Sequence, residues 1–375
     1  MTKTDATPPG ATPSGATPSA PERSGTTTKR RSRVRPVSVF AALVVLTCAL
    51  AVFSACVGQV PTTPFEVLGS VFHRLGLDVG PMPAHPSGDV TLWQVRFPRI
   101  ALGAVVGASL GCAGALLQGV FANPLAEPGV IGVSSGAAVG ASSMIVLGGA
   151  FAGVWWVAAA AFVGGLITTV AVYVLARGGG RTEVVTLILT GVAVNAFAGG
   201  LIAFFTFVAS PAARDQIVFW QLGSLAGATW QAVSVVAPLA LVGICASMVI
   251  ATRLDLLALG ENVARHLGVD VERLRQTAIV IVAVLVASGV AFTGIILFVG
   301  LVVPHLMRMM LGPAHRTLVP ASALCGAVVL LASDLVARSL VDNVDMPLGM
   351  ITSLVGAPFF FWMLRRTRAR QGGWA

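Results

Sequence analysis

Long apolar stretches separated by short polar segments run through most of the chain. About 20 apolar residues in a helix cross the ~30 Å hydrocarbon core of a bilayer, so we interpret these stretches as membrane spans. The first span is Pro36–Gly58, and nine more are predicted at 97–119, 128–148, 152–176, 184–208, 231–252, 276–292, 295–311, 318–337 and 347–364. The pattern therefore predicts an all-α polytopic membrane protein with about ten transmembrane helices.

The longest apolar run, Gln276–Leu311, has to be interrupted. As a single helix it would be about 54 Å long at 1.5 Å per residue, which far exceeds the hydrocarbon core. We expect the break at Phe292–Gly294, which leaves two short spans.

The two ends of the chain differ from the apolar middle. Residues 1–35 are mostly Pro, Thr, Ser, Gly and Ala and end in KRRSRVR, so we expect a disordered, basic cytoplasmic tail. A basic run, an apolar stretch and Cys56 could also form a lipoprotein signal peptide. Because the stretch is long enough to span and nine more follow, we interpret it as an uncleaved first span. Residues 36–368 are the expected transmembrane domain, and 369–375 a cytoplasmic C-terminal tail.

Charge predicts the orientation. The chain has 375 residues, of which 56% are hydrophobic and 10% charged, and a net charge of +9. The basic residues form short clusters between apolar segments, as in cytoplasmic loops, which excludes a nucleic-acid role. With both termini inside, 19 of the 24 Lys and Arg lie on the inner side. The outer side then holds only Arg74, Arg96, Arg99, Arg214 and Arg338.

The second span carries glycines at four-residue spacing, Gly103, Gly107 and Gly111. A helix face without side chains lets a neighbour approach closely, so this span should lie inside the bundle. A GxSxG pattern of serine hydrolases occurs at Gly132–Gly136. That motif needs a strand-turn-helix context, and here it falls in a predicted membrane helix, so we interpret its serines as packing residues.

Ionisable groups inside the spans would indicate coupling to an ion gradient. Apart from Arg99 at the very start of the second span, only His305, Arg308 and Asp334 lie within spans, and Asp334 can pair with Arg338 one turn later. An ion-coupled secondary transporter is therefore the less favoured alternative. The cysteines have no metal-ligand spacing and no metal site is predicted.

The longest inner loop, Ala251–Arg275, alternates apolar and charged residues around Gly260. This pattern predicts two short amphipathic helices joined at a glycine turn. They could lie on the membrane surface or insert into a groove on a partner protein.

Six motifs in order resemble one known family: RFPRIALGAVVGASLGCAGALLQGVFANPLAEPGVIGVSSGAAVGA, FWQLGSLAGATW, ALGENVARHLGV, GIILFVGLVVPHLMRMMLGPAHR, ASDLVAR and MPLGMITSLVGAPFFFWMLRR. They are similar to the FecCD-type permeases of ATP-binding-cassette (ABC) importers for ferric siderophores, haem and vitamin B12. The resemblance covers about residues 60–368. It implies the bundle of the vitamin B12 importer permease, in the inner membrane of a bacterial cell.

The resemblance also implies the partners. They are a second permease subunit, identical or different, two cytoplasmic ATPase subunits that hold ATP and Mg, and an extracytoplasmic substrate-binding protein. The chain itself would be no enzyme, with no catalytic residue or cofactor of its own. A ferric siderophore is the expected cargo, with vitamin B12 or haem as alternatives.

The same resemblance assigns three sites. The loop with Gly260, Glu261, Ala264, Leu267 and Gly268 would dock on the ATPase. Asn123, Pro124 and Leu125 would help to close the cytoplasmic gate, and a second gate segment would fall near Glu183–Thr186. Arg96, Arg99 and Arg338 would meet acidic residues of the binding protein, as two separated cationic patches in a dimer. The alternative for Arg96 and Arg99 is anchoring in lipid headgroups.

Overall fold

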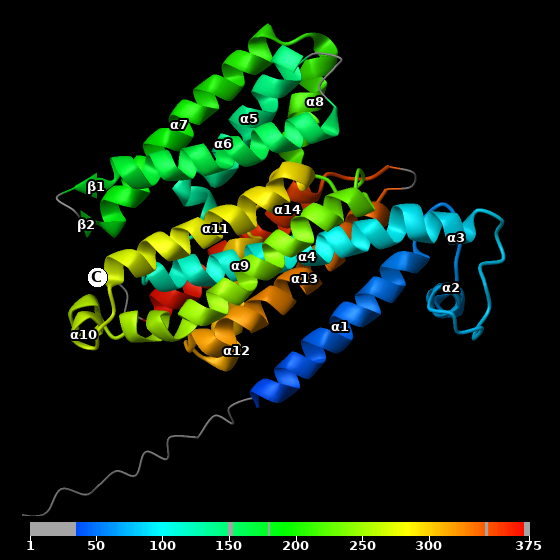
Figure 1. Ribbon diagram of the computed structural model, residues 1–375, viewed down its shortest axis with the longest axis horizontal. Helices are drawn as coiled ribbons and strands as arrows, with labels where there is room; N and C mark the ends of the chain where they lie inside the picture. The colour runs from blue at the N-terminus through cyan, green and yellow to red at the C-terminus, as the bar shows by residue number, and fades with distance from the viewer. Residues whose placement is uncertain (1–34, 149–152, 179–180, 342–343, 371–375) are drawn as a thin grey trace, which may run out of the picture. The chain divides into compact units, whose positions relative to one another are not determined.

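The computed structural model describes residues 35–148, 153–178, 181–341 and 344–370, which belong to one compact unit (Figure 1). The tail predicted at 1–35 lies outside these residues except for Arg35. The elements in chain order are α1 Pro36–Cys56, α2 Pro64–Arg74, α3 Gly88–Thr91, the π-helix η1 Leu92–Arg96, α4 Phe97–Val120, the 3-10 helix η2 Pro128–Ile131, α5 Val133–Gly148, α6 Val154–Leu175, β1 Arg177–Gly178, β2 Arg181–Thr182, α7 Val184–Val208, α8 Pro211–Leu222, α9 Trp230–Leu257, α10 Glu261–His266, α11 Val271–Thr293, α12 Val299–Leu311, α13 His315–Ser339 and α14 Leu348–Arg370.

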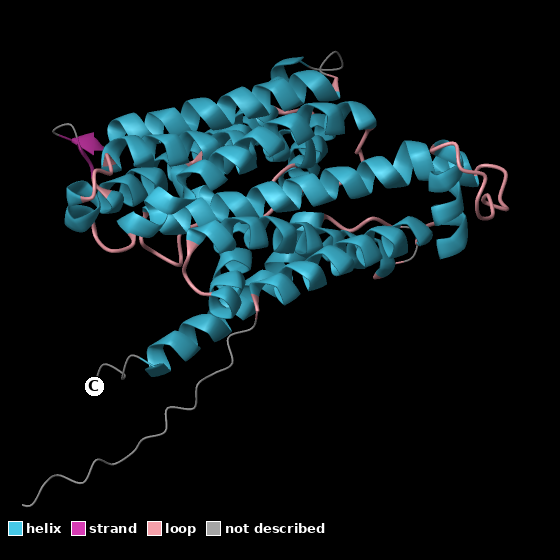
Figure 2. Cartoon of the chain, turned by 60° about the horizontal axis from the view of Figure 1, so that its bottom comes forward, coloured by secondary structure: helices cyan, strands magenta, loops and turns pink. Residues whose placement is uncertain are grey.

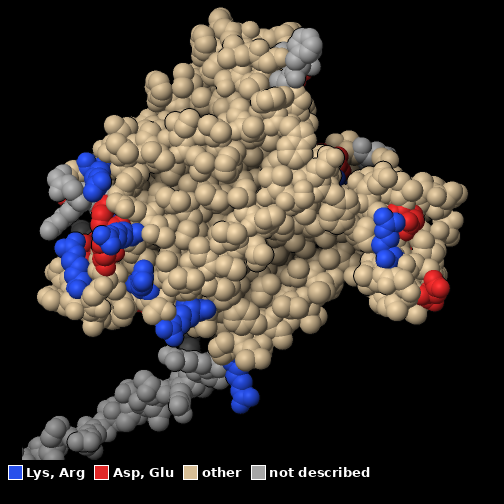
Figure 3. Space-filling model, viewed as in Figure 1, with Lys and Arg blue, Asp and Glu red and all other residues tan. Residues whose placement is uncertain are grey.

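Each of the ten predicted spans contains a helix. Seven helical segments in the described residues are long and apolar enough to cross a membrane by themselves, and three shorter apolar helices, α5, α12 and the first part of α14, complete the set. Figure 3 shows charged side chains at the two ends of the bundle and a broad uncharged band between them. The predicted all-α polytopic fold is confirmed.

The glycine-rich α4 lies at the centre of the bundle and packs against α13, α9, α11 and α12. A Cβ atom built on Gly107 would lie 2.3 Å from the carbonyl oxygen of Gly326, and one on Gly111 would lie 2.1 Å from that of Ser322. The backbones of α4 and α13 therefore touch directly. The expectation that this span is interior is confirmed, since 72% of its apolar window is buried.

The predicted break of the longest run is also confirmed. Helix α11 ends at Thr293, and Gly294 takes a left-handed φ of +69°. A Cβ atom there would lie 2.1 Å from the carbonyl oxygen of Trp220, so glycine is needed for space as well as for conformation. A non-helical segment, residues 294–298, then leads to α12.

Four boundaries differ from the prediction. Helical backbone is continuous from Gly88 to Val120, nine residues before the expected start of the second span. The third span is α-helical only from Val133. The first of the two expected loop helices is the end of α9, which runs unbroken to Leu257. Helix α14 reaches Arg370, inside the tail expected at 369–375.

Three elements are absent from the prediction: α2, α8 and a small hairpin. Strands β1 and β2 pair antiparallel, with Arg177 opposite Thr182 and Gly178 opposite Arg181. Helices α2 and α8 have 11 and 12 residues, too few for a span, so a search for long apolar runs passes over them.

Two ends of the bundle carry the predicted sites. We call the end that holds α3 and the start of α4 the Arg99 end, and the opposite end, which holds α10 and the hairpin, the α10 end (Figures 1 and 2).

Candidate functional site

Arg99 lies between two carboxylates at the Arg99 end. Its Nη2 and Nε atoms are each 3.0 Å from Asp334 Oδ1 on α13, and its Nη1 is 2.6 Å from Asp345 Oδ2 in the segment before α14. The Asp334 side chain is 2% exposed, whereas that of Asp345 is 42% exposed. One carboxylate therefore fixes the guanidinium from inside the bundle, and the other is open to the surroundings.

Arg338 joins the same cluster. Its Nε is 3.2 Å from Asp334 Oδ2, so the predicted one-turn ion pair is present, although these two atoms are not aligned for a hydrogen bond. Its Nη2 donates to Ser54 Oγ at 2.6 Å and its Nη1 to the Val57 carbonyl at 3.1 Å. Arg338 thus ties the end of α13 to the end of α1.

Arg96 points into the turn that follows α1. Its guanidinium donates to the carbonyl oxygens of Ala55 and Val60 and, at 2.6 Å, to Thr62 Oγ1. Thr62 Oγ1 also donates to the Ala55 carbonyl at 3.1 Å, so Arg96 and Thr62 together hold this bend in the chain.

The docking role predicted for Arg96, Arg99 and Arg338 stays a prediction, but the structure shows that Arg96 and Arg99 are not free at the surface. The two residues are only 4% and 8% exposed, and each is paired within the chain. The sequence pattern could not reveal this, because Asp334 and Asp345 are more than 230 positions away from Arg99.

Helix α10 forms the tip of the α10 end. The φ angles of Gly260 and Gly268, which bracket it, are +111° and +83°, so both turns need glycine. Ala264 is fully buried, and Glu261 pairs with Arg265 at 3.3 Å and with Arg275. These contacts hold α10 firmly against the start of α11.

Apolar side chains are exposed at this tip beside the polar Asn262, Arg265 and His266. Leu259, Val263 and Leu267 recur every four residues and are 63%, 45% and 55% exposed. Of the predicted loop residues, Leu267 belongs to this surface, whereas Ala264 and Glu261 serve the internal packing. The sequence analysis did not single out Val263, although its spacing from Leu267 could have indicated it.

Residues 121–132 turn back into the bundle from the end of α4. Asn123 Oδ1 accepts from the Leu125 backbone N–H at 2.9 Å, and this turn leaves Pro124 and Leu125 exposed. Further along, a Cβ atom on Gly300 would lie 2.9 Å from Pro128 Cδ, and one on Gly191 would lie 1.9 Å from the Val130 carbonyl oxygen. The predicted gate residues therefore begin a segment that is wedged between α4, α7 and α12.

Two polar side chains that the sequence analysis did not single out fix this segment. Glu127 Oε1 accepts from the Phe298 backbone N–H at 3.2 Å, at the start of α12. Asn195 Nδ2, on α7, donates to the Gly129 carbonyl at 3.1 Å. The second predicted gate segment, Glu183–Thr186, caps and begins α7, with Thr186 Oγ1 3.2 Å from Glu183 Oε2.

The GxSxG residues follow η2 and begin α5, so the strand of a nucleophile elbow does not precede them. Ser135 donates to the Gly132 carbonyl at 3.0 Å and lies 2.6 Å from Asn195 Oδ1. The serines are used for packing and hydrogen bonding, as interpreted.

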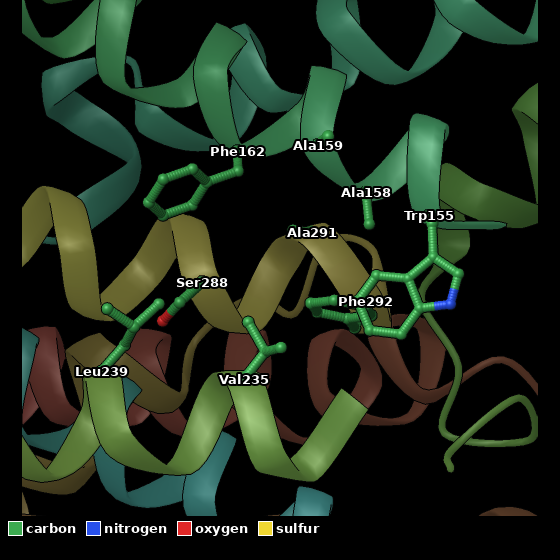
Figure 4. Close-up of a pocket in the computed structure, with 9 residues that line it drawn as sticks. All are labelled: Trp155, Ala158, Ala159, Phe162, Val235, Leu239, Ser288, Ala291 and Phe292. Carbon is green, nitrogen blue, oxygen red and sulfur yellow. The ribbon is translucent and has the colours of Figure 1, made fainter. Parts of the chain in front are cut away.

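An apolar cavity of about 180 Å³ lies between α6, α9 and α11 (Figure 4). Trp155 and Phe292 meet edge to face across it, 5.3 Å between centroids, and Ser288 supplies a hydroxyl group. Ligand pockets for drug-sized molecules are usually 300 Å³ or larger. None of the predicted site residues lines this cavity.

The ten apolar helices, the glycine-rich centre and the exposed tip at α10 define a polytopic membrane permease. The chain belongs to the FecCD transport family, whose profile matches residues 44–366. It is 38% identical over 371 residues to the cobalamin import system permease BtuC of Halobacterium salinarum, covering 91% of this chain and 99% of the relative. It is also 38% identical over 286 residues to the hemin transport system permease HmuU of Yersinia pestis, covering 75% and 85%.

A solved structure also resembles this fold. It is an inward-facing conformation of an ABC transporter described as of metal-chelate type, with a TM-score of 0.78 and 31% identity, and the match covers 88% of this chain and all of that one. The chain is therefore a multi-pass permease of the ABC importer class.

Proposed function

We propose that this permease imports a ferric siderophore that an extracytoplasmic binding protein delivers and that ATP hydrolysis on separate subunits drives. The observation that carries the proposal is the tip at α10, where Leu259, Val263 and Leu267 are exposed in and directly beside a short helix held rigidly by Gly260, Gly268 and its ion pairs. A rigid helical tip with exposed apolar side chains suits insertion into a groove on a partner protein.

The proposed orientation places the α10 end and both termini in the cytoplasm. The excess of Lys and Arg on this side supports it, because cytoplasmic loops are enriched in these residues. The Arg99 end would then face the binding protein, and the gate segment at Asn123–Leu125 would close the cytoplasmic side.

A second permease subunit would cover the least buried span. Only 17% of the apolar window of α7 is buried, and Phe197, Phe204 and Phe207 on it are 58% exposed or more. Leu354 and Val355 of α14 are exposed to a similar degree. We propose that two subunits, identical or different, meet through these helices.

The cargo is proposed as a metal held inside an organic chelator. The relatives are named for cobalamin and hemin, and the similar structure for a metal chelate. Within this class a ferric siderophore is our leading choice, because the motifs resemble permeases for such compounds, with vitamin B12 and haem next.

The test uses the complete complex, reconstituted in liposomes with its ATPase and binding protein. ATP-dependent uptake of ⁵⁵Fe-siderophore, ⁵⁷Co-cobalamin and haemin is compared. Uptake of the ferric siderophore supports the proposed cargo. Uptake of only cobalamin or only haemin would refute it and identify that compound as the cargo.

Coupling is tested with Val263→Ala combined with Leu267→Ala. Truncation of central anchor residues typically costs about 2 kcal/mol or more at an interface, so ATPase association and uptake should fall together. The matched control is Leu241→Ala with Val242→Ala, on the exposed side of α9 within the spanning region. Full uptake by the α10 variant would refute the coupling role.

A further inference from the structure

Helix α2 lies across the direction of the spans at the Arg99 end. Figure 1 looks almost along its axis while α1 and α4 run across the page, and in Figure 2, after rotation about the horizontal axis, it stands upright at the right-hand end. A helix in this position is parallel to the membrane surface when the spans cross the bilayer.

The free face of α2 is apolar. Phe65, Leu68, Phe72 and Leu75 follow one another at intervals of three or four residues, which places them on one side of the helix. They are 73%, 41%, 37% and 70% exposed. We call these four residues the α2 stripe.

The other two sides of α2 are already occupied. Val67 packs with Ala55 of α1 and Leu92 of η1. On the side that carries Glu66 and Gly69, the loop before α3 covers the helix. A Cβ atom on Gly69 would lie 2.1 Å from the Pro81 carbonyl oxygen, and Glu66 Oε1 accepts from the Ala84 backbone N–H at 2.9 Å.

This arrangement is the reverse of that in a helix on a water-exposed surface, where the large apolar side chains face the protein. Here the packed sides hold Gly69, Ser70 and Val67, and the two phenylalanines and two leucines remain outside. The medium on that side has to be apolar for the helix to be stable in this position.

We infer that the α2 stripe inserts into the lipid leaflet at the Arg99 end. An amphipathic helix that lies in the interface buries its apolar face at the boundary of headgroups and acyl chains. The neighbouring residues fit that depth, since the guanidinium of Arg74 lies 5.0 Å from the ring centroid of Trp93, Trp is enriched at the membrane interface and Arg can serve as an interfacial anchor. Ser70 Oγ accepts from Trp93 Nε1 at 2.9 Å and so holds this ring against α2.

The lipid contact would fix this end of the bundle in depth. Thr62, directly before the cap of α2, accepts from Arg96, and Arg96 also holds the last turn of α1. The stripe, the turn after α1 and the start of α4 are thus connected by side-chain contacts.

The experiment measures the depth of spin labels on the full-length permease in phosphatidylethanolamine and phosphatidylglycerol liposomes. Cys48, Cys56 and Cys245 are replaced by alanine, and labels are attached at Leu68→Cys, Phe72→Cys or, as control, Asp78→Cys, whose native side chain is 98% exposed. Labels on the stripe should be relaxed more by oxygen, which concentrates in lipid, than by a water-soluble nickel chelate. The control should show the opposite order.

Greater access of the nickel chelate to Leu68→Cys and Phe72→Cys would overturn the inference. If the nickel chelate reaches these labels in the permease alone but not after the binding protein is added, the stripe is a protein-docking surface instead. Because the measurement needs neither cargo nor ATPase, its result is independent of the proposed function.

Discussion

Arg99 and Asp345 form a 2.6 Å ion pair that joins α4 to the segment leading into α14, across 246 positions of sequence. Asp334, on the other side of the same guanidinium, is buried, whereas Asp345 is partly open. An approaching carboxylate could therefore replace Asp345 at Arg99 while Asp334 stays in place. In the proposed function, such a carboxylate would belong to the binding protein.

This relationship predicts that Asp345→Asn strengthens docking of the binding protein. The substitution keeps the shape of the side chain and removes the internal competitor, so affinity should rise several-fold at low ionic strength and fall more steeply with salt. Docking is measured by surface plasmon resonance on the reconstituted complex. Asp78→Asn removes the same charge from an exposed site and should change affinity less; equal effects of the two variants would refute the exchange.

Gly107→Ala should destabilise the permease. The new Cβ would lie 2.3 Å from the Gly326 carbonyl oxygen and 2.8 Å from Leu330 Cβ, and overpacking of this kind typically costs about 1–3 kcal/mol. With Cys48, Cys56 and Cys245 replaced by alanine, heating with a thiol-reactive dye reports unfolding, because the remaining Cys112 and Cys325 are buried. Gly153→Ala is the control, since nothing lies within 4 Å of its added atom. Unchanged melting of Gly107→Ala would contradict the close contact.

The start of α2 should loosen in acid. Glu66 accepts hydrogen bonds from the Thr63 backbone N–H at 2.7 Å and from that of Ala84, and these bonds lower the pKa of its carboxyl below the ordinary value. Because the pKa of Glu66 is lower in the folded state, its ionised carboxylate stabilises the cap fully at pH values above the ordinary pKa, about 4.3. This stabilisation is lost as the pH falls through the lowered pKa of the folded state.

Amide hydrogen exchange at Thr63 and Ala84, corrected for intrinsic rates, measures this loss. The protection should decrease between neutral pH and pH 3 in the native chain. Glu66→Gln should show weaker protection that does not change over this range. A native chain with constant protection would exclude the role of Glu66.

Orientation is tested with cysteines at three loops. Ala84→Cys and Ser210→Cys should react with an impermeant thiol reagent added to intact cells, because both precede helices at the Arg99 end. Gly178→Cys, in the hairpin at the α10 end, should react only after the membrane is opened. Reaction of Gly178→Cys in intact cells would reverse the proposed orientation.

The spans could be predicted from sequence because membrane helices depend on local apolarity, which each segment carries within itself. Gly294 also marked the break between α11 and α12, since a left-handed residue there favours glycine. The ion-pair partners of a charged residue, by contrast, depend on contacts between segments that are distant in sequence. Nothing near Arg99 in sequence indicates that Asp334 and Asp345 lie beside it, yet the fold pairs its guanidinium with both carboxylates.

The α2 stripe was missed for a related reason. Phe65, Leu68, Phe72 and Leu75 are a clear helical pattern, but such a pattern does not state which side faces the protein. Only the contacts of Val67, Glu66 and Gly69 show that the apolar side is the free one.

The direct contact of α4 with α13 restricts how this permease can move. Gly107 faces Gly326 and Gly111 faces Ser322, so a slide by one turn, about 5.4 Å, would replace Gly326 opposite Gly107 by a residue that has a side chain, Ser322 or Leu330. Main-chain atoms cannot relieve such a clash by changing rotamer, as side chains can. We therefore expect α4 and α13 to move as one rigid body through every stage of a transport cycle. The motion that opens and closes a passage should then come from other helices that rotate relative to this pair.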